Sequence, residues 1–589
     1  MQNDTYILFK TGFFSSLDYY LSDRLTNIAR ENNPIIKLSI ALVSKAIREG
    51  QIYIDLEQIA DKSITITDPS ITNNISDNKN TQIKFKFPPK VKFLEALSLS
   101  ILVGQDSNSP LVLDPDNKLY LARYYALQKR IADNILHRIQ HTKPQLNQAL
   151  FKAEIHKHFN SNENYSHDEA QGISTQKQAV QKALQNNFII ISGGPGTGKT
   201  YVIDIIAKII TGLNKSNTKP EIINTALTGK AASKLNSGLT IHRLLGLKNK
   251  KDFIYNHNKK KIAADCVIID ETSMIDISLM DRLLEAIDIS TKLIFVGDKN
   301  QLGSIETGSI FSDLCKSKLL EPNIINLNYN FRSINAKTIN LLADAVTNGN
   351  IKKLESILLS SESSDLNKSK DLCFINTSDS LKIDQKIENL ITQGYTPYIM
   401  EPDIKAAQKK LNQFKILCTH RHGLYGTENL NMVAEKLLQD YQIHDINQEI
   451  LKSIIMITKN DYKNLLFNGD TGILIEKNQM RNAVFFNDNS QDLISRSFNL
   501  SELKAFEKAF AITVHKSQGS EFDHVVFILP SIHSKLLTRE IIYTAITRAK
   551  HKLTIAGDIN IIKKAVASHG GQESGIQKMI DNNLDNHEK

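Results

Sequence analysis

Residues 193–200, GGPGTGKT, carry the strongest chemical signal in the sequence, because their spacing fits a phosphate-binding loop. They follow the apolar run FIIIS and precede the apolar run YVIDIIAKII, so the glycines connect a predicted strand to a predicted helix. Glycines in this place let backbone N–H groups converge on a phosphate, and the helix N-terminus adds its dipole. The pattern predicts a nucleoside triphosphate site in which Lys199 reaches the β- and γ-phosphates and Thr200 binds magnesium.

Two acids follow a second apolar run, CVIID, which predicts a buried strand ending at Asp270. The carboxyl end of a parallel strand faces the ligand crevice, so Asp270 is expected to hold magnesium through water. Glu271 is expected to act as general base toward the attacking water. The same two acids could cap a helix, although the phosphate loop makes this the weaker interpretation. A third strand, KLIFVG, leads to Gln301, which could sense the γ-phosphate or be a solvated loop residue.

Two arginines lie far along the chain, Arg332 in LNYNFRS and Arg548 in REIIYTAITRAKHKL. A guanidinium supplied by a second domain can stabilise transition-state charge and report the nucleotide state across a cleft. Most arginines are solvated or salt-bridged, so residue type alone leaves both roles open. Gln176, which precedes the glycine loop, could likewise be any helix-face residue.

The elements that must position these residues change character along the chain. Residues 1 to about 165 show mainly helical periodicity, as in LYLARYYALQKRIADNILHRI. From there, short β-branched runs alternate with helices, which is typical of buried parallel strands in an α/β domain. A similar rhythm returns after about residue 320 and ends in HVVFILP and KLTIAG. The tail after Gly570 is expected to be mobile.

Composition limits the class of protein. A chain of 589 residues is too long for one core, so several domains are expected, and a net charge of +9 makes nucleic acid a reasonable partner without deciding the matter. The four cysteines show no CxxC spacing, which indicates no zinc or iron–sulfur site and suits a reducing compartment. No run approaches the roughly 18 apolar residues of a membrane span, so a cytoplasmic protein without membrane contact is expected.

The motifs occur in an order that resembles the superfamily-1 DNA helicases, from Gln176 to Lys550. The resemblance is carried by TQKQAV, GGPGTGKT, TALTGKAASKL, TIHRLLG, DETSM, GDKNQL, LNYNFRS, VHKSQGSEF and YTAITRAK. TGKAASKL followed by TIHRLLG and FNGDTGIL is similar to the 5′-to-3′ RecD branch, the alpha subunits of bacterial RecBCD helicase/nucleases (exonuclease V). Two segments of the N-terminal region, GFFSSLDYYLSDRL and SKAIREGQIYIDLEQIA, are similar to the RecD N-terminal domain.

The resemblance implies an α/β fold with two RecA-like parallel-sheet motor domains, ATP and Mg²⁺ between them, and single-stranded DNA across their top. It implies a mainly helical, partner-docking N-terminal domain at 1–165, a first motor domain at 166–320 and a second at 321–589. A pin-like insertion is expected at 247–265, and a small SH3-like β insertion at 465–505.

Family roles carry over to individual residues by motif. Gln176 would read adenine, Glu521 would contact the ribose, and Arg332 and Arg548 would be arginine fingers. The nucleotide loop comprises Gly193, Gly194, Pro195, Gly196, Thr197, Gly198, Lys199 and Thr200. DNA contacts are implied for Thr228, Lys230, Thr240 and His242 in the first motor domain and for Thr513, His515 and Ser517 in the second.

The function implied by the resemblance is an ATP-dependent 5′-to-3′ DNA helicase subunit. It would form a heterotrimer with RecB- and RecC-like subunits and act on single strands and double-strand ends in recombinational repair. LDPDNKLY superficially resembles a nuclease element, but a Pro-Asp turn between strands explains it better, so the nuclease centre is expected in a partner. The alternatives are a stand-alone RecD-like helicase and a nucleotide-gated DNA-binding subunit that does not translocate.

Overall fold

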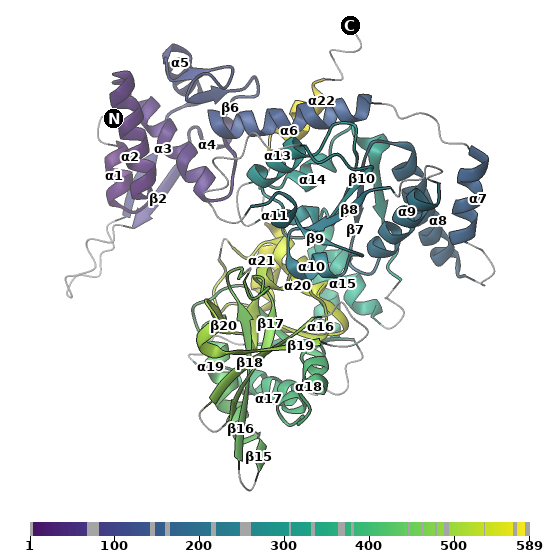
Figure 1. Ribbon diagram of the computed structural model, residues 1–589. Coiled ribbons are helices and arrows are strands. Elements are labelled where there is room, and N and C mark those ends of the chain that lie inside the picture. The colour runs from purple at the N-terminus through teal and green to yellow at the C-terminus, as the bar shows by residue number, and fades with distance from the viewer. Residues whose placement is uncertain are drawn as a thin grey trace, which may run out of the picture.

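Two parallel sheets, each covered by helices, form the body of the protein, and smaller N-terminal and antiparallel units are attached to them (Figure 1). The computed structural model describes residues 4–67, 82–141, 148–159, 165–213, 220–247, 261–304, 308–331, 336–362, 371–377, 382–441, 443–445, 448–461, 463–477, 480–487, 494–534, 536–568 and 574–583. Within these ranges, no helix combines the length and the apolar composition that a bilayer-spanning segment needs.

The first parallel sheet has its strands in the order β12–β7–β11–β10–β8–β9. These strands are Ile324–Leu327, Phe188–Gly193, Lys292–Gly297, Cys266–Asp270, Ile222–Ala226 and Leu239–Thr240. Their runs of Ile, Val and Phe suit strands that are covered on both faces. In β7, Phe188 and Ile190 face one core, and Ile189 and Ile191 face the other. The predicted α/β fold is confirmed.

Helices cover both faces of this sheet. One face packs against α8 (His167–Gln185) and α9 (Lys199–Leu213). The other packs against α6 (Ala122–Gln140) and α13 (Ile277–Ala286). Because the strands are parallel, their carboxyl ends meet at a single edge, and the loops that follow β7, β10 and β11 gather there.

The second parallel sheet has the order β13–β23–β22–β14–β21. These strands are Leu372–Asn376, Ala549–Gly557, Phe522–Ile528, Phe414–Cys418 and Ala511–Thr513. One apolar core joins the sheet to its helices, which are α15 (Lys337–Thr347), α16 (Ile351–Ser360), α17 (Gln385–Ile399), α18 (Ile404–Leu411), α19 (Thr427–Leu438), α20 (Arg539–Ile546) and α21 (Ile559–Ala567).

An antiparallel sheet is inserted between α19 and β21. Its strands are β15 (Ile443–Asp445), β16 (Gln448–Ile457), β17 (Thr471–Lys477), β18 (Met480–Asn487), β19 (Ile494–Asn499) and β20 (Phe506–Lys508). It contains the range 465–505 predicted for an SH3-like insertion and begins earlier, at β15 and β16. The end of β16, from Ile454 to Ile457, is an apolar run that is buried in the structure. Such a run resembles a core strand of a parallel sheet, so the sequence did not indicate that it belongs to the antiparallel sheet. The SH3-like identity stays a prediction.

The N-terminal unit combines helices with short strands. Its helices are α1 (Asp4–Lys10), α2 (Ser16–Ala29), α3 (Pro34–Arg48), α4 (Leu56–Ile59) and α5 (Lys90–Leu99). One of its sheets has the strand order β1 (Tyr53–Asp55), β6 (Lys118–Leu121), β5 (Leu111–Leu113) and β4 (Val103–Gly104). The other sheet pairs β2 (Ser63–Thr67) with β3 (Gln82–Lys86). The LDPDNKLY segment is the turn between β5 and β6, as the sequence predicts.

Helix α6 continues from β6 but packs on the first parallel sheet, as Figure 1 shows. The two parallel sheets with their helices are called the first and second motor domains below, after the names used in the sequence prediction. The buried Arg138 donates hydrogen bonds to the carbonyls of Thr291 (2.8 Å) and Ile287 (2.9 Å). Arg130 forms a bidentate pair with Asp281 at 2.9 and 2.7 Å. The predicted N-terminal range 1–165 therefore has two parts, and the second covers the first motor sheet.

The C-terminal segment is a helix, not a mobile tail. The prediction of mobility after Gly570 is wrong for residues 574–583, because α22 (Ile576–Asp581) packs beside α6 and buries Ile576 and Ile580 completely. Asp581 accepts hydrogen bonds from Ser317 Oγ (2.6 Å) and the Leu319 N–H (3.1 Å). A six-residue helix has too little local pattern to be predicted alone, and its partners lie hundreds of residues earlier.

Replacement of a buried isoleucine of α22 tests this docking. Ile580→Ala should lower the free energy of unfolding by about 2–5 kcal/mol, because it opens a cavity in the first motor core. Thermal unfolding of the full-length chain measures the effect. Ile532→Ala, at a side chain that is 78% exposed, is the matched control and should leave the melting temperature almost unchanged. Equal melting temperatures for the two variants would contradict the docked position of α22.

Candidate nucleotide site and interdomain cleft

The glycine loop connects β7 to α9 and forms a tight turn. Gly196 and Gly198 have positive φ angles of 81° and 85°, a region that suits glycine. A Cβ atom on Gly198 would lie 2.2 Å from Nε2 of Gln176, so this position has no room for a side chain. Lys199 donates from Nζ to the carbonyls of Gly193 (2.7 Å) and Gly194 (3.0 Å), which holds the ammonium group over the loop.

Gln176 supports the loop from α8. It is 4% exposed, and its Nε2 donates to the carbonyl of Thr197 at 3.0 Å. Thr197 Oγ1 in turn donates to the Gly194 carbonyl at 2.8 Å. The structure thus gives Gln176 a contact with the phosphate loop, while its role toward adenine stays a prediction.

The two predicted acids lie at the end of β10. Asp270 is 8% exposed and accepts a hydrogen bond from the Glu271 N–H at 2.8 Å. Burial, together with the nearby Glu271 carboxylate, raises the pKa of Asp270, and the Lys199 ammonium acts in the opposite sense. Glu271 adopts a left-handed backbone with φ 52°, which is uncommon for a residue with a side chain. Such strain is concentrated at functional sites.

Asp298 and Gln301 follow β11 and are buried together. Asp298, 1% exposed, accepts hydrogen bonds on Oδ2 from Gln301 Nε2 (2.9 Å) and from the Tyr543 hydroxyl (3.2 Å). Burial raises the pKa of Asp298. Gln301 Oε1 is buried and has no hydrogen-bond partner among the residues that the structure describes. It is therefore an acceptor that a water molecule could satisfy.

Arg548 lies in the second motor domain, in the turn between α20 and β23. Its guanidinium is 2% exposed and donates to the carbonyls of Ser520 (3.1 Å) and Thr544 (3.2 Å). Arg332 lies outside the described residues, as do residues 248–260 of the predicted pin-like insertion. Glu521 directly follows Ser520 and is half-buried.

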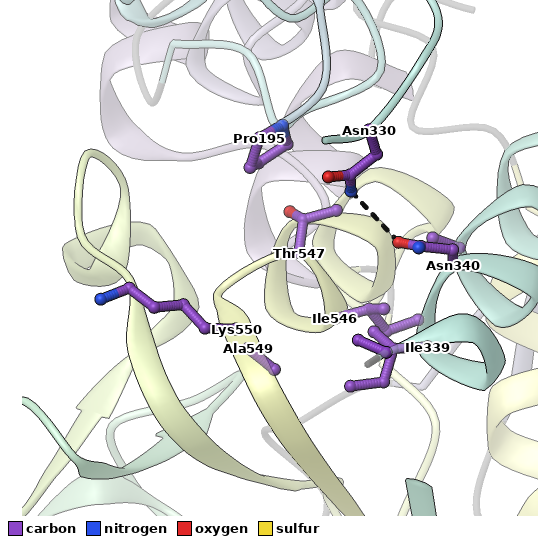
Figure 2. A pocket seen from close by; sticks show the side chains of 10 residues that line it. Pro195, Asn330, Ile339, Asn340, Ile546, Thr547, Ala549 and Lys550 are labelled. Carbon is purple, nitrogen blue, oxygen red and sulfur yellow. Dashed lines mark hydrogen bonds between the residues drawn. The ribbon is translucent and has the colours of Figure 1, made fainter. Parts of the chain in front are cut away.

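Beside the loop, the two motor domains enclose a cavity of about 40 Å³. Pro195 of the phosphate loop lies on one side, and Thr547 and Lys550 of the second motor domain lie on the other (Figure 2). Asn330 donates to Asn340 Oδ1 at 3.2 Å in the same place. The phosphate loop therefore faces the second motor domain directly.

The segment VHKSQGSEF joins the two motor domains. Gln518 Nε2 donates to the Leu302 carbonyl at 2.8 Å, and Lys234 Nζ donates to the Gly519 carbonyl at 2.8 Å. Thr513 precedes a short 3-10 helix, in which Ser517 Oγ donates to the Val514 carbonyl at 2.7 Å. Burial lowers the pKa of His515, which favours its neutral form. Gln518 and Gly519 are therefore the residues of this segment that contact the first motor domain.

A larger cavity of about 310 Å³ lies between the first motor domain, the second motor domain and the antiparallel sheet. Lys230 and Thr240, both predicted DNA contacts, line it. Thr228 and Thr240 also cap the short helices α10 (Gly229–Ser233) and α11 (Ile241–Leu244). Burial lowers the pKa of His242. Thr513, His515 and Ser517 do not line this cavity.

Several residues of this cleft were missed in the sequence. Aromatic and cationic side chains both line it, namely Phe467, Phe485, Phe486, Phe522, Arg243 and Arg496. Phe467 lies so close to the first motor domain that a Cβ on Gly229 would be 3.0 Å from its Cβ. Cationic and aromatic side chains in one groove are the chemistry that holds phosphates and stacks bases of a single strand. Phe467, Arg243 and Phe522 stand in the quoted segments FNGDTGIL, TIHRLLG and VHKSQGSEF, but those segments gave no side-chain direction.

Three family models match parts of the chain. Residues 10–120 match the N-terminal domain of the RecBCD enzyme subunit RecD, residues 176–307 match an AAA domain, and residues 508–556 match the UvrD-like helicase C-terminal domain. These segments cover most of the N-terminal unit, the glycine loop with five of the six strands of the first parallel sheet, and the part of the second sheet next to Arg548.

Curated relatives are similar over nearly the whole chain. The RecBCD enzyme subunit RecD of Mycolicibacterium smegmatis is 27% identical over 602 residues, covering 96% of this chain and 97% of the relative. RecD of Buchnera aphidicola subsp. Schizaphis graminum is 29% identical, covering 93% and 96%. The ATP-dependent RecD2 DNA helicase of Deinococcus radiodurans is 26% identical, covering 67% and 50%. A solved Pif1 helicase from Bacteroides with ADP-AlF3 and ssDNA aligns with a TM-score of 0.37 at 18% identity, covering 70% of this chain and 96% of that chain.

Truncation of Phe467 tests the cleft. Phe467→Ala should weaken the binding of a single-stranded oligonucleotide roughly tenfold, because the loss of one stacking platform costs about 1–3 kcal/mol. Fluorescence anisotropy at fixed salt measures the affinity. Phe506→Ala, in β20 of the same sheet and outside the cavity lining, is the control for sheet stability. Unchanged affinity for Phe467→Ala would remove the antiparallel sheet from the binding surface.

Proposed function

We propose that this chain, which is a RecD protein, is the ATP-dependent 5′-to-3′ DNA helicase subunit of a RecBCD-type helicase/nuclease that unwinds DNA from double-strand ends. One observation supports this most directly: a RecD N-terminal domain at 10–120 precedes a complete glycine loop and its acids in the same chain. Its proposed substrate is DNA, and its proposed partners are RecB- and RecC-like subunits. The proposed process is recombinational repair, which places the protein in the cytoplasm. The nuclease centre belongs to a partner.

In this proposal the chain hydrolyses ATP with groups from both motor domains. Lys199 leaves its loop carbonyls to contact the β- and γ-phosphates. Glu271 takes a proton from the attacking water, and Gln301 Oε1 accepts a hydrogen bond from that water. Arg548, held by the carbonyls of Thr544 and Ser520, would offer its guanidinium to the charge of the transition state. Arg332 is proposed as the second arginine finger, and Gln176 and Glu521 as contacts for adenine and ribose.

Magnesium suits the oxygen atoms present at this site. Thr200 offers a hydroxyl and Asp270 a carboxylate, both ligand types that Mg²⁺ prefers. No group of three or more His, Cys, Asp or Glu that could hold a metal occurs among the described residues, which fits an ion bound largely by the phosphates of the nucleotide. When bound, the ion would neutralise charge on the β- and γ-phosphates.

DNA is proposed to bind across both motor domains. Lys230, Thr240 and Arg243 line the larger cleft together with Phe467. The segment from Thr513 to Ser517 directly precedes Gln518 and Gly519, which contact the first motor domain. Gln518 contacts Leu302, which lies in the loop after β11. A bound DNA strand that moves the segment from Thr513 to Gln518 would therefore also act on the nucleotide site. The two ligands are coupled through this contact.

Helix α2 supports docking of the N-terminal unit onto a partner subunit. Its polar residues Asp18, Ser22 and Thr26 face inward, and Asp18 is paired with Arg48 at 3.0 Å. Its outer face carries Leu17, which is 66% exposed, and Tyr20 and Ile28, which are also exposed. Because Leu21 and Leu25 of the same helix pack against the N-terminal core, α2 carries apolar residues on its outer face as well as on its inner one. An exposed apolar face of this kind marks a binding surface, and a RecB- or RecC-like subunit is the proposed occupant.

Substitution of Glu271 tests the motor chemistry. Glu271→Gln should keep ATP binding and lower DNA-stimulated hydrolysis by roughly 100-fold or more, because the general base is removed without a change in shape. Phosphate release with and without single-stranded DNA measures the rate. Glu285→Gln, on α13, is the control. A wild-type chain whose ATPase ignores DNA would contradict the helicase proposal, and a normal rate in Glu271→Gln would contradict the site assignment.

Substitutions on the outer face of α2 test partner docking. The double variant Leu17→Glu and Tyr20→Glu should stop the tagged chain from co-purifying with its RecB- and RecC-like subunits, because charges replace the apolar contact. Its DNA-stimulated ATPase should persist, since α2 is remote from the glycine loop (Figure 1). Leu359→Glu, at an exposed position of the second motor domain, is the control. Intact co-purification of the double variant would contradict this docking surface.

A further inference from the structure

Tyr543 is a side chain of the second motor domain that reaches the nucleotide site of the first. It lies in α20, is 8% exposed, and donates from its hydroxyl to Asp298 Oδ2 at 3.2 Å. A Cβ atom on Gly194 would lie 3.1 Å from the same hydroxyl, so the hydroxyl also sits against the phosphate loop. The ring belongs to one motor domain, and its polar atom contacts the other.

Asp298 joins Tyr543 to Gln301 through a single oxygen atom. Oδ2 accepts from Gln301 Nε2 at 2.9 Å as well as from Tyr543, and Oδ1 accepts from the Asn300 N–H at 3.1 Å. With its amide nitrogen engaged, Gln301 has a fixed orientation that leaves Oε1 without a partner among the described residues. Burial and the Asp298 carboxylate raise the pKa of Tyr543 well above its ordinary value, so the hydroxyl stays a donor.

Two further hydrogen bonds cross the boundary at the same loop. The Leu302 N–H donates to Thr544 Oγ1 at 2.9 Å, and Gln518 Nε2 donates to the Leu302 carbonyl at 2.8 Å. Residues 298–302 are therefore held by the second motor domain at three points. The hydrogen bond from Tyr543 differs from the other two hydrogen bonds because its acceptor is the Asp298 carboxylate, which also orients Gln301.

We propose that Tyr543 is a positioning residue that ties the orientation of Gln301 to the placement of the second motor domain. The inference rests on the proposed function and concerns the regulation of the same site. When the motor domains meet as observed, the Tyr543 hydroxyl holds Asp298, and Asp298 holds Gln301 with Oε1 free to accept a hydrogen bond from water. When they separate, the hydroxyl leaves Asp298 and Gln301 loses its support. Hydrolysis thereby depends on the domain that also carries Arg548 and one side of the DNA cleft.

Tyr543→Phe removes only the hydroxyl and tests this role in the full-length chain. With saturating single-stranded DNA, kcat for ATP should fall roughly tenfold or more, because a catalytic group is mispositioned. KM for ATP should stay within about twofold, since Lys199 and the loop still bind the nucleotide. The ring stays buried, so the melting temperature should match that of the control below.

Tyr398→Phe is the matched control. Tyr398 lies in α17 of the same domain, is 1% exposed, and donates to the Ser453 carbonyl at 3.2 Å, the same length as the bond to Asp298. This variant should lose the same kind of hydrogen bond and keep the kcat of the wild type. Equal kcat values for the two variants, or a fall in melting temperature alone for Tyr543→Phe, would overturn the proposal.

A double-mutant cycle with Asp298→Asn examines whether the two residues act together. If Tyr543 works through Asp298, the double variant should be no slower than the slower single variant. Multiplicative losses would mean that Tyr543 acts elsewhere and would overturn the proposal. The controls separate this outcome from failure of the proposed function, which would appear as a wild-type ATPase that single-stranded DNA does not stimulate.

Discussion

In a parallel sheet all strands end at the same edge, and the functional arrangement of this protein depends on that constraint. β11 lies between β7 and β10, so the glycine loop, the acids Asp270 and Glu271, and the Asp298–Gln301 pair follow neighbouring strands. Pairing of the parallel strands alone brings together chain segments that are about a hundred residues apart in the sequence. Asp270 and Asp298 are buried at this edge, and their burial raises the pKa of both carboxyl groups. The Lys199 ammonium lowers the same pKa values and so partly offsets the effect of burial.

The boundary between the two motor domains differs in kind from their interiors. Each domain has its own apolar cores, whereas many of the contacts between them are hydrogen bonds, among them Tyr543 to Asp298 and Lys234 to Gly519. Hydrogen bonds to water can replace such contacts when the domains separate, so breaking them costs little net free energy. An apolar core would not open in this way. A boundary of this kind suits the motor function proposed above, in which nucleotide and DNA would each act on the contact between the domains.

The two ends of the chain take opposite roles. Near the N-terminus, α2 turns polar side chains inward and leaves Leu17 and Tyr20 exposed, which prepares a surface for another subunit. Near the C-terminus, α22 returns from the second motor domain to the first and completes its core with Ile576 and Ile580. The second motor domain is therefore joined to the first at both of its chain ends. The exposed face of α2 and the boundary between the motor domains lie in different parts of the molecule (Figure 1).

The sequence alone determined the glycine loop, the strand-end acids and the α/β fold, because these depend on local requirements: glycine conformations, β-branched runs and strand ends. It did not determine Tyr543, the aromatic cleft around Phe467, the early start of the antiparallel sheet or the docking of α22. Those features depend on contacts between residues far apart in the chain, and a side chain's direction is settled only when both elements are packed. Tyr543 lies in a helix with an ordinary amphipathic sequence. The sequence of that helix does not indicate that the Tyr543 hydroxyl donates a hydrogen bond to Asp298. Tertiary packing decided that contact, because it sets which face of α20 is turned toward the other domain.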